Sequence, residues 1–68
     1  MGRRIRIARR AAGMTQHQLA VALGTGDAMT VSRWERGEHR PTDERLLALA
    51  ELFDVDVSWF YEPIAAVA

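Results

Sequence analysis

The sequence predicts an all-α fold, a compact bundle of five helices without a strand. Along most of the chain, apolar side chains recur every three or four residues, which is the spacing of one helix face. Residues that cap helices precede most of these runs, and glycine follows three of them. The chain has 68 residues and no cysteine. Because so short a chain buries only roughly 60% of its unfolded surface, helix packing without disulfides must hold the fold.

The first predicted helix covers about residues 3–12. Ile5, Ala8 and Ala12 recur on it at helical spacing, and Gly13 provides a left-handed stop. The segment has the charges of a surface helix and lacks the apolar run of a signal peptide. No stretch of the chain approaches the roughly 20 apolar residues that span a bilayer, so no membrane contact is expected.

The second predicted helix covers residues 16–23. Thr15 stands at its N-cap, and Gln18 three residues later completes a capping box. Gly24 ends the helix.

The third predicted helix covers residues 28–36, with Asp27 as its cap and Gly37 as its stop. Val31 and Trp34 share its apolar face. This spacing assigns Trp34 to the core, although an indole can also stack on DNA.

A fourth helix is expected over residues 43–53 and a fifth over residues 57–62. Pro41 forces an extended link before the fourth helix, because the residue preceding a proline avoids the helical conformation. Thr42 caps the fourth helix and Asp56 the fifth.

The second and third helices have the form of a helix-turn-helix unit. Such a unit needs a small residue where the helices cross, a glycine in the turn and an apolar residue that locks the second helix. Ala20, Gly24 and Val31 fill these roles. Arg33 then points outward from the third predicted helix, the second of this unit, where it can reach a duplex groove.

Charge is divided between the two halves of the chain, although the formal net charge is +0. Residues 1–40 carry eight arginines against three acidic residues, and residues 41–68 carry one arginine against six acidic residues. One end can therefore face phosphates while the other repels them. Two solvated faces without any partner are the alternative interpretation.

Several motifs occur in an order that is typical of one family. They are Arg9, the run Gly13-Met14-Thr15-Gln16 with Leu19-Ala20, the run from Val31 to Gly37, Pro41, Leu49-Ala50 and the run from Val55 to Phe60. Over about residues 3–62 the chain resembles the DNA-binding domains of Cro and lambda-type phage repressors, also called the xenobiotic-response-element family. The resemblance implies a five-helix, lambda-repressor-like bundle whose second and third helices bind DNA.

The resemblance also implies roles for individual residues. Ala28, Met29 and Arg33 match the base-reading positions, where an arginine can contact guanine and apolar groups can contact the thymine methyl. Arg9 and Glu35 match a structural ion pair between the first and third helices. The DNA backbone is expected to meet Arg10, Gln16, Thr30, Ser32, Arg36 and Arg40.

Two positions depart from the family pattern. Counted from Gln16, Val31 falls at the sixteenth place, where the family usually has its fifteenth. The turn of residues 25–27 is therefore one residue longer, and the start of the reading helix is open to a shift. Asp54 stands where many relatives have a helix-stopping glycine.

A partner surface is expected near the C-terminal end. Trp59, Phe60 and Tyr61 are consecutive, so a short helix cannot bury all three against one core. Ile64 and the apolar tail over residues 64–68 extend this surface.

These features favour a sequence-specific DNA-binding regulator, a phage or bacterial repressor that works in the cytoplasm and binds double-stranded DNA as a homodimer. An antitoxin of the same fold, which also binds a toxin, is one alternative. A protein-interaction module that no longer reads DNA is another. No catalytic constellation, metal site or cofactor site is predicted.

Overall fold

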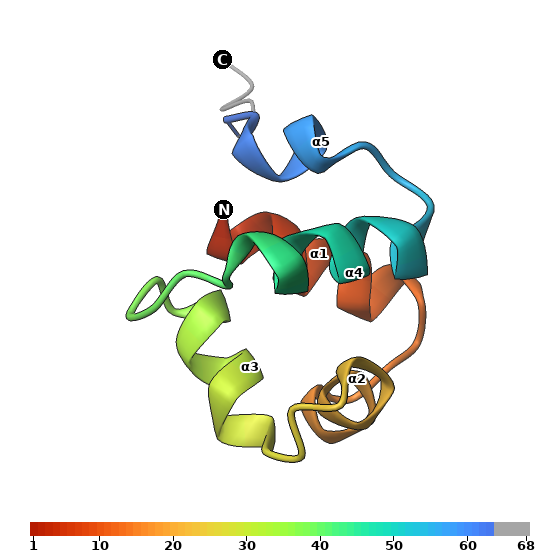
Figure 1. Cartoon of the computed structure of the whole chain (residues 1–68), viewed down its shortest axis with the longest axis vertical. Helices are drawn as coiled ribbons and strands as arrows, with labels where there is room; N and C mark the ends of the chain where they lie inside the picture. Colours follow the sequence, from red (N-terminus) through yellow and green to blue (C-terminus); the bar gives the residue numbers. More distant parts are fainter. Residues whose placement is uncertain (64–68) are drawn as a thin grey trace.

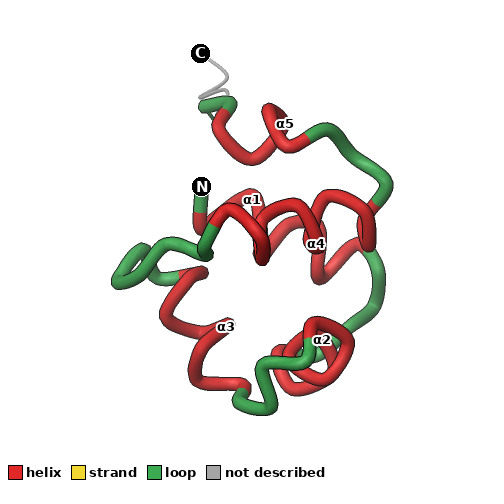
Figure 2. Tube along the Cα trace, viewed as in Figure 1, coloured by secondary structure: helices red, strands yellow, loops and turns green. Residues whose placement is uncertain are grey.

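The computed structural model describes residues 1–63 of the chain, and five helices and no strand occur within them (Figures 1 and 2). The helices are α1 (Gly2–Ala11), α2 (Gln16–Leu23), α3 (Ala28–Glu35), α4 (Asp43–Phe53) and α5 (Val57–Tyr61). Figure 1 shows α1 and α4 across the middle of the molecule, with α2 and α3 on one side and α5 on the other. None of these helices is long and apolar enough to cross a membrane.

The helix ends agree with the sequence prediction to within one residue. The bounds of α2 and α4 are as predicted, whereas α1 begins and ends one residue earlier, and α3 and α5 each end one residue earlier. Glu62 leaves α5 with extended backbone angles (φ −70°, ψ 137°) because it precedes Pro63.

Side-chain caps start three of the helices. Thr15 and Gln18 form the predicted capping box at α2, the Asp27 side chain accepts from Met29 N at 2.9 Å, and the Thr42 hydroxyl accepts from Arg45 N at 3.2 Å. Asp56 occupies the predicted N-cap position of α5, but its side chain forms no cap hydrogen bond.

All five helices contribute to one core. Its buried residues are Ile5, Leu19, Ala20, Val31, Trp34, Leu46, Leu49, Ala50 and Phe60. Between α4 and α5, Asp54 is the C-cap residue of α4. It adopts a left-handed conformation (φ 55°, ψ 48°), which aspartate tolerates better than most residues.

The N-terminal end of α1 packs closely on the C-terminal end of α3. A methyl group added at Gly2 would lie 2.7 Å from the carbonyl oxygen of Glu35 and closer still to that of Trp34. These neighbours are backbone atoms, which cannot swing aside, so this contact between α1 and α3 requires a glycine.

Gly2→Ala is therefore expected to destabilise the fold by about 1–3 kcal/mol, the usual cost of overpacking. At an unhindered helix position the same change stabilises by roughly 0.5–1 kcal/mol, so the sign of the effect distinguishes the two cases. Urea unfolding of the variant, with the exposed neighbour Arg3→Ala as control, measures the change. A variant more stable than the parent would contradict the packing described.

Candidate nucleic-acid interface

The turn between α2 and α3 contains two left-handed glycines. Gly24 and Gly26 have φ of 71° and 72°, a region that residues with a Cβ rarely adopt. Between them, the Thr25 N–H and hydroxyl both donate to the Ala20 carbonyl, at 3.0 and 3.3 Å. The turn therefore closes onto α2, and α3 begins at Ala28 as the sequence predicts.

Helix α3 has one buried and one exposed face. Val31 is fully buried and Trp34 is 5% exposed, which confirms that the indole belongs to the core. Arg33 is exposed, and it forms no ion pair with any residue from 1 to 63. Met29 is 48% exposed, whereas Ala28 is half-buried. Two of the three predicted base-reading side chains thus lie on the open face of α3.

A buried ion pair joins α1 to the end of α3. Arg9 Nε and Nη2 donate to the Glu35 carboxylate at 2.6 and 3.1 Å, and Arg9 Nη1 donates to the Met14 carbonyl at 2.8 Å. Arg6 Nε and Gln16 Nε2 also approach Glu35 Oε1, at 3.3 and 3.2 Å. The carboxylate therefore connects α1, α2 and α3, and its side chain is fully buried.

The protonation of Glu35 is set by two opposing effects. Burial raises the pKa of its carboxyl, but hydrogen bonds from Arg9, Gln16 and Arg6, with the charge of Arg9, outweigh burial and leave the pKa below its ordinary value. The hydrogen bond to Glu35 in turn raises the pKa of the Arg9 guanidinium. Both partners are charged near neutral pH, as a bidentate pair requires.

Four of the six residues predicted to contact the DNA backbone lie on α1, α2 or α3 outside the core. Arg10 is exposed, and Thr30 and Ser32 are half-buried. Gln16 at the start of α2 is also half-buried. Because its side chain already donates to Glu35, one of its two amide protons remains for a phosphate.

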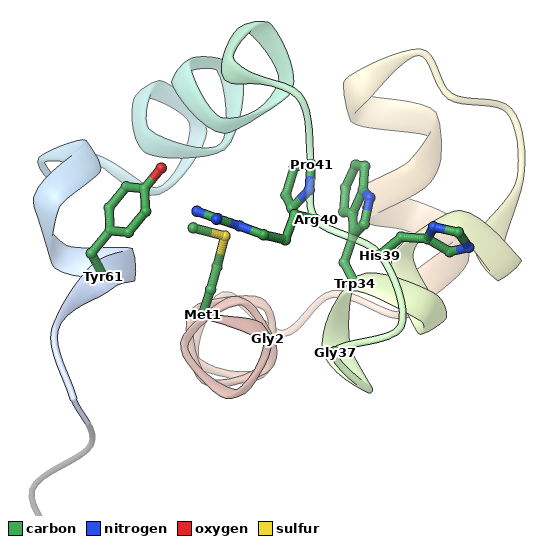
Figure 3. A pocket seen from close by; sticks show the side chains of 8 residues that line it. All are labelled: Met1, Gly2, Trp34, Gly37, His39, Arg40, Pro41 and Tyr61. Carbon is green, nitrogen blue, oxygen red and sulfur yellow. The ribbon is translucent and has the colours of Figure 1, made fainter.

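The two other predicted backbone contacts, Arg36 and Arg40, have partners within the chain. Arg36 Nε lies 3.0 Å from a Glu38 oxygen, and both side chains are about half exposed. The Arg40 guanidinium lies 5.5 Å from the centre of the Tyr61 ring. Figure 3 shows this guanidinium directed toward Tyr61 across a pocket that Met1 and Trp34 also line.

The uneven charge of the sequence persists on the folded surface. In residues 1–40, six of the eight arginines are exposed, namely Arg3, Arg6, Arg10, Arg33, Arg36 and Arg40. The six acidic residues of the C-terminal half lie within residues 43–62, and all six are exposed. Cations therefore accompany α1 and α3, and carboxylates accompany α4 and α5.

The predicted partner surface needs one correction. Phe60 is fully buried, so its assignment to that surface is wrong. Consecutive helical residues point about 100° apart, and α5 is oriented so that the middle aromatic enters the core. Tyr61 is 53% exposed and Trp59 is half-buried, while Ile64 lies outside the described residues.

Several contacts between helices have no signal in the sequence. Arg4 of α1 lies over the Trp59 ring, 4.7 Å from its centre, and donates to the Pro63 carbonyl at 3.0 Å. Arg45 of α4 donates to the Leu23 carbonyl at the end of α2. From the sequence alone, an arginine in a charged helix is expected to be solvated. Only the folded structure shows that Arg4 and Arg45 connect helices.

Comparison with known proteins agrees with this geometry. A family model described as helix-turn-helix matches residues 5–60. The chain belongs to the helix-turn-helix family. The resemblance to Cro and lambda-type repressor domains, which rested on sequence motifs, is thereby confirmed. No solved structure matches the chain at a significant level.

Curated members of the helix-turn-helix family include related regulators. The chain is 39% identical over 59 residues to "HTH-type transcriptional regulator DicA" of Escherichia coli (strain K12), covering 87% of this chain and 43% of that protein. It is 34% identical over 62 residues to an uncharacterized HTH-type transcriptional regulator of Sinorhizobium medicae (strain WSM419), covering 91% of this chain and 44% of that protein. The chain thus spans less than half the length of these relatives.

The buried ion pair predicts a pH dependence of stability. Because the folded pKa of Glu35 is depressed, its contribution is present above the unfolded value of about 4.3 and is lost as the pH falls through the folded value. Glu35→Gln should cost about 3 kcal/mol at pH 7, and this difference should shrink toward pH 3. Urea unfolding across this range, with exposed Glu51→Gln as control, measures the effect. A pH-independent difference would contradict it.

Proposed function

We propose that this chain is the DNA-binding domain of a phage or bacterial transcriptional repressor that binds a palindromic operator as a homodimer. The observation that carries the proposal is α3, whose inner face is anchored by Val31, Trp34 and Glu35 while Arg33 is exposed and without an ion-pair partner in residues 1–63. A rigid helix with a free guanidinium suits the major groove. Such a regulator works in the cytoplasm.

In this complex, α3 enters the major groove. Arg33 donates two hydrogen bonds to O6 and N7 of a guanine, and Met29 packs on a thymine methyl with Ala28 beside it. The start of α2 with Gln16 binds a phosphate, because helix N-termini favour anions. Arg10 supplies a further phosphate contact, as an exposed cation.

Two copies bind half-sites about 34 Å apart, so that both α3 helices meet one side of the duplex. The proposed dimer contact uses α5, where Tyr61 is exposed and Trp59 is half-buried. Exposed aromatic side chains are enriched at protein interfaces. The acidic residues of α4 and α5 would face away from the phosphates.

Arg33→Ala is expected to cost about 1–3 kcal/mol on the preferred site and to relax the preference at one base pair. Binding measured on a panel of duplexes that vary one position at a time tests this effect. An affinity loss that is equal at every base position would remove Arg33 from base reading.

Arg10→Ala is expected to weaken binding to all sequences alike and to lower the salt slope of the binding constant by about 1. Titrations at several salt concentrations measure the slope. Arg3→Ala, on the same helix, serves as the comparison, and an unchanged slope for Arg10→Ala would exclude its phosphate contact.

Selection of bound sites from random duplexes, with the mass of the complex measured in the same sample, tests the whole proposal. A palindromic consensus bound by two copies is the expected result. Random recovered sequence would contradict sequence-specific binding. A tight protein partner that co-purifies would favour the antitoxin if DNA binding persists, and an interaction module if it does not.

A further inference from the structure

A small pocket opens on the flank of α3, beside its exposed face. Its walls are Thr30, Arg33, Trp34 and His39, and its volume is about 230 Å³. Three of these residues belong to α3, and His39 comes from the loop that follows. We call this feature the indole pocket, because the indole of Trp34 is its most buried wall.

The indole nitrogen of Trp34 lacks a partner within the described chain. Trp34 is 5% exposed, and its Nε1 donates to no acceptor among residues 1–63. Figure 3 shows this nitrogen on the ring edge that faces His39. Among residues 1–63, Arg4 Nε is the one side-chain nitrogen that is both fully occluded and without a hydrogen-bond partner. Trp34 Nε1 also lacks a partner, so it is not fully occluded and a group from outside the chain can reach it. Buried tryptophans usually donate this N–H to an acceptor.

Every polar side chain of the indole pocket can donate a hydrogen bond, and none is acidic. The Thr30 hydroxyl and the Arg33 guanidinium make no hydrogen bond or ion pair with residues 1–63. The carboxylate nearest in sequence to His39 is that of Glu38, which already pairs with Arg36 at 3.0 Å. Hydroxyl, guanidinium, indole and imidazole groups thus surround a space without a neutralising anion.

We infer that the indole pocket receives a phosphate group of the DNA backbone, with Trp34 Nε1 and His39 as its donors and Thr30 at its rim. This assignment rests on the proposed function and adds a contact to it. The pocket adjoins the exposed face of α3 through Arg33, so a phosphate held there sets how deep α3 sits in the groove. Because Trp34 is fixed by the core, its N–H makes this contact without losing side-chain freedom.

Removal of the indole N–H tests the site. Trp34→Phe keeps an aromatic ring in the core but removes the N–H. It should weaken binding to duplexes of any sequence by about tenfold, the loss of affinity expected when a hydrogen bond to a charged group is removed. His39→Ala should weaken binding to a similar extent without touching the core. Leu47→Ala, which truncates an exposed apolar side chain on α4, should leave the affinity within about twofold.

Nuclear magnetic resonance of the unmodified chain gives a second readout, which does not depend on how well Trp34→Phe folds. On addition of a duplex, the indole proton of Trp34 should shift and exchange more slowly with water. If the wild-type chain binds no duplex at low salt, the proposed function is wrong and this site with it. If it binds, but the Trp34 resonance stays unchanged and His39→Ala binds normally, the phosphate site alone is wrong.

Discussion

The bidentate contact between Arg9 and Glu35 is the constraint on which the rest of the interface depends. It ties the last turn of α1 to the last residue of α3, and Gln16 ties the start of α2 to the same carboxylate. A buried carboxylate with several donors has little freedom to move. The three helices nearest the proposed DNA surface are therefore fixed relative to one another at one end, and the close approach of Gly2 reinforces that junction.

The same arrangement determines which cations remain available. Arg9 is paired with Glu35, and Arg4 contacts the Trp59 ring and the Pro63 carbonyl. Arg33 has no ion-pair partner among residues 1–63. Partnered arginines hold helices together, and unpartnered ones can exchange solvent for phosphates or bases. One residue type thus serves two purposes, and its position in the tertiary structure separates them.

Helix α5 closes the opposite side of the bundle from α2 and α3 (Figure 1). Phe60 anchors it in the core, and Arg4 holds it against α1. Its exposed Tyr61 also meets Arg40, from the loop that follows α3. The proposed dimer surface and the proposed DNA surface are thereby joined through a single loop, which gives association and DNA binding a direct physical connection.

The sequence by itself determined the helices, their caps and the helix-turn-helix pairing, because a cap at Thr15 or a glycine stop at Gly24 depends on residues a few positions apart. Only the tertiary structure decided that Phe60 enters the core and that Gln16 reaches Glu35. It also decided that Trp34 and His39 line one pocket. These outcomes depend on how helices are rotated and placed against one another, which side chains distant in sequence settle together and no local pattern encodes.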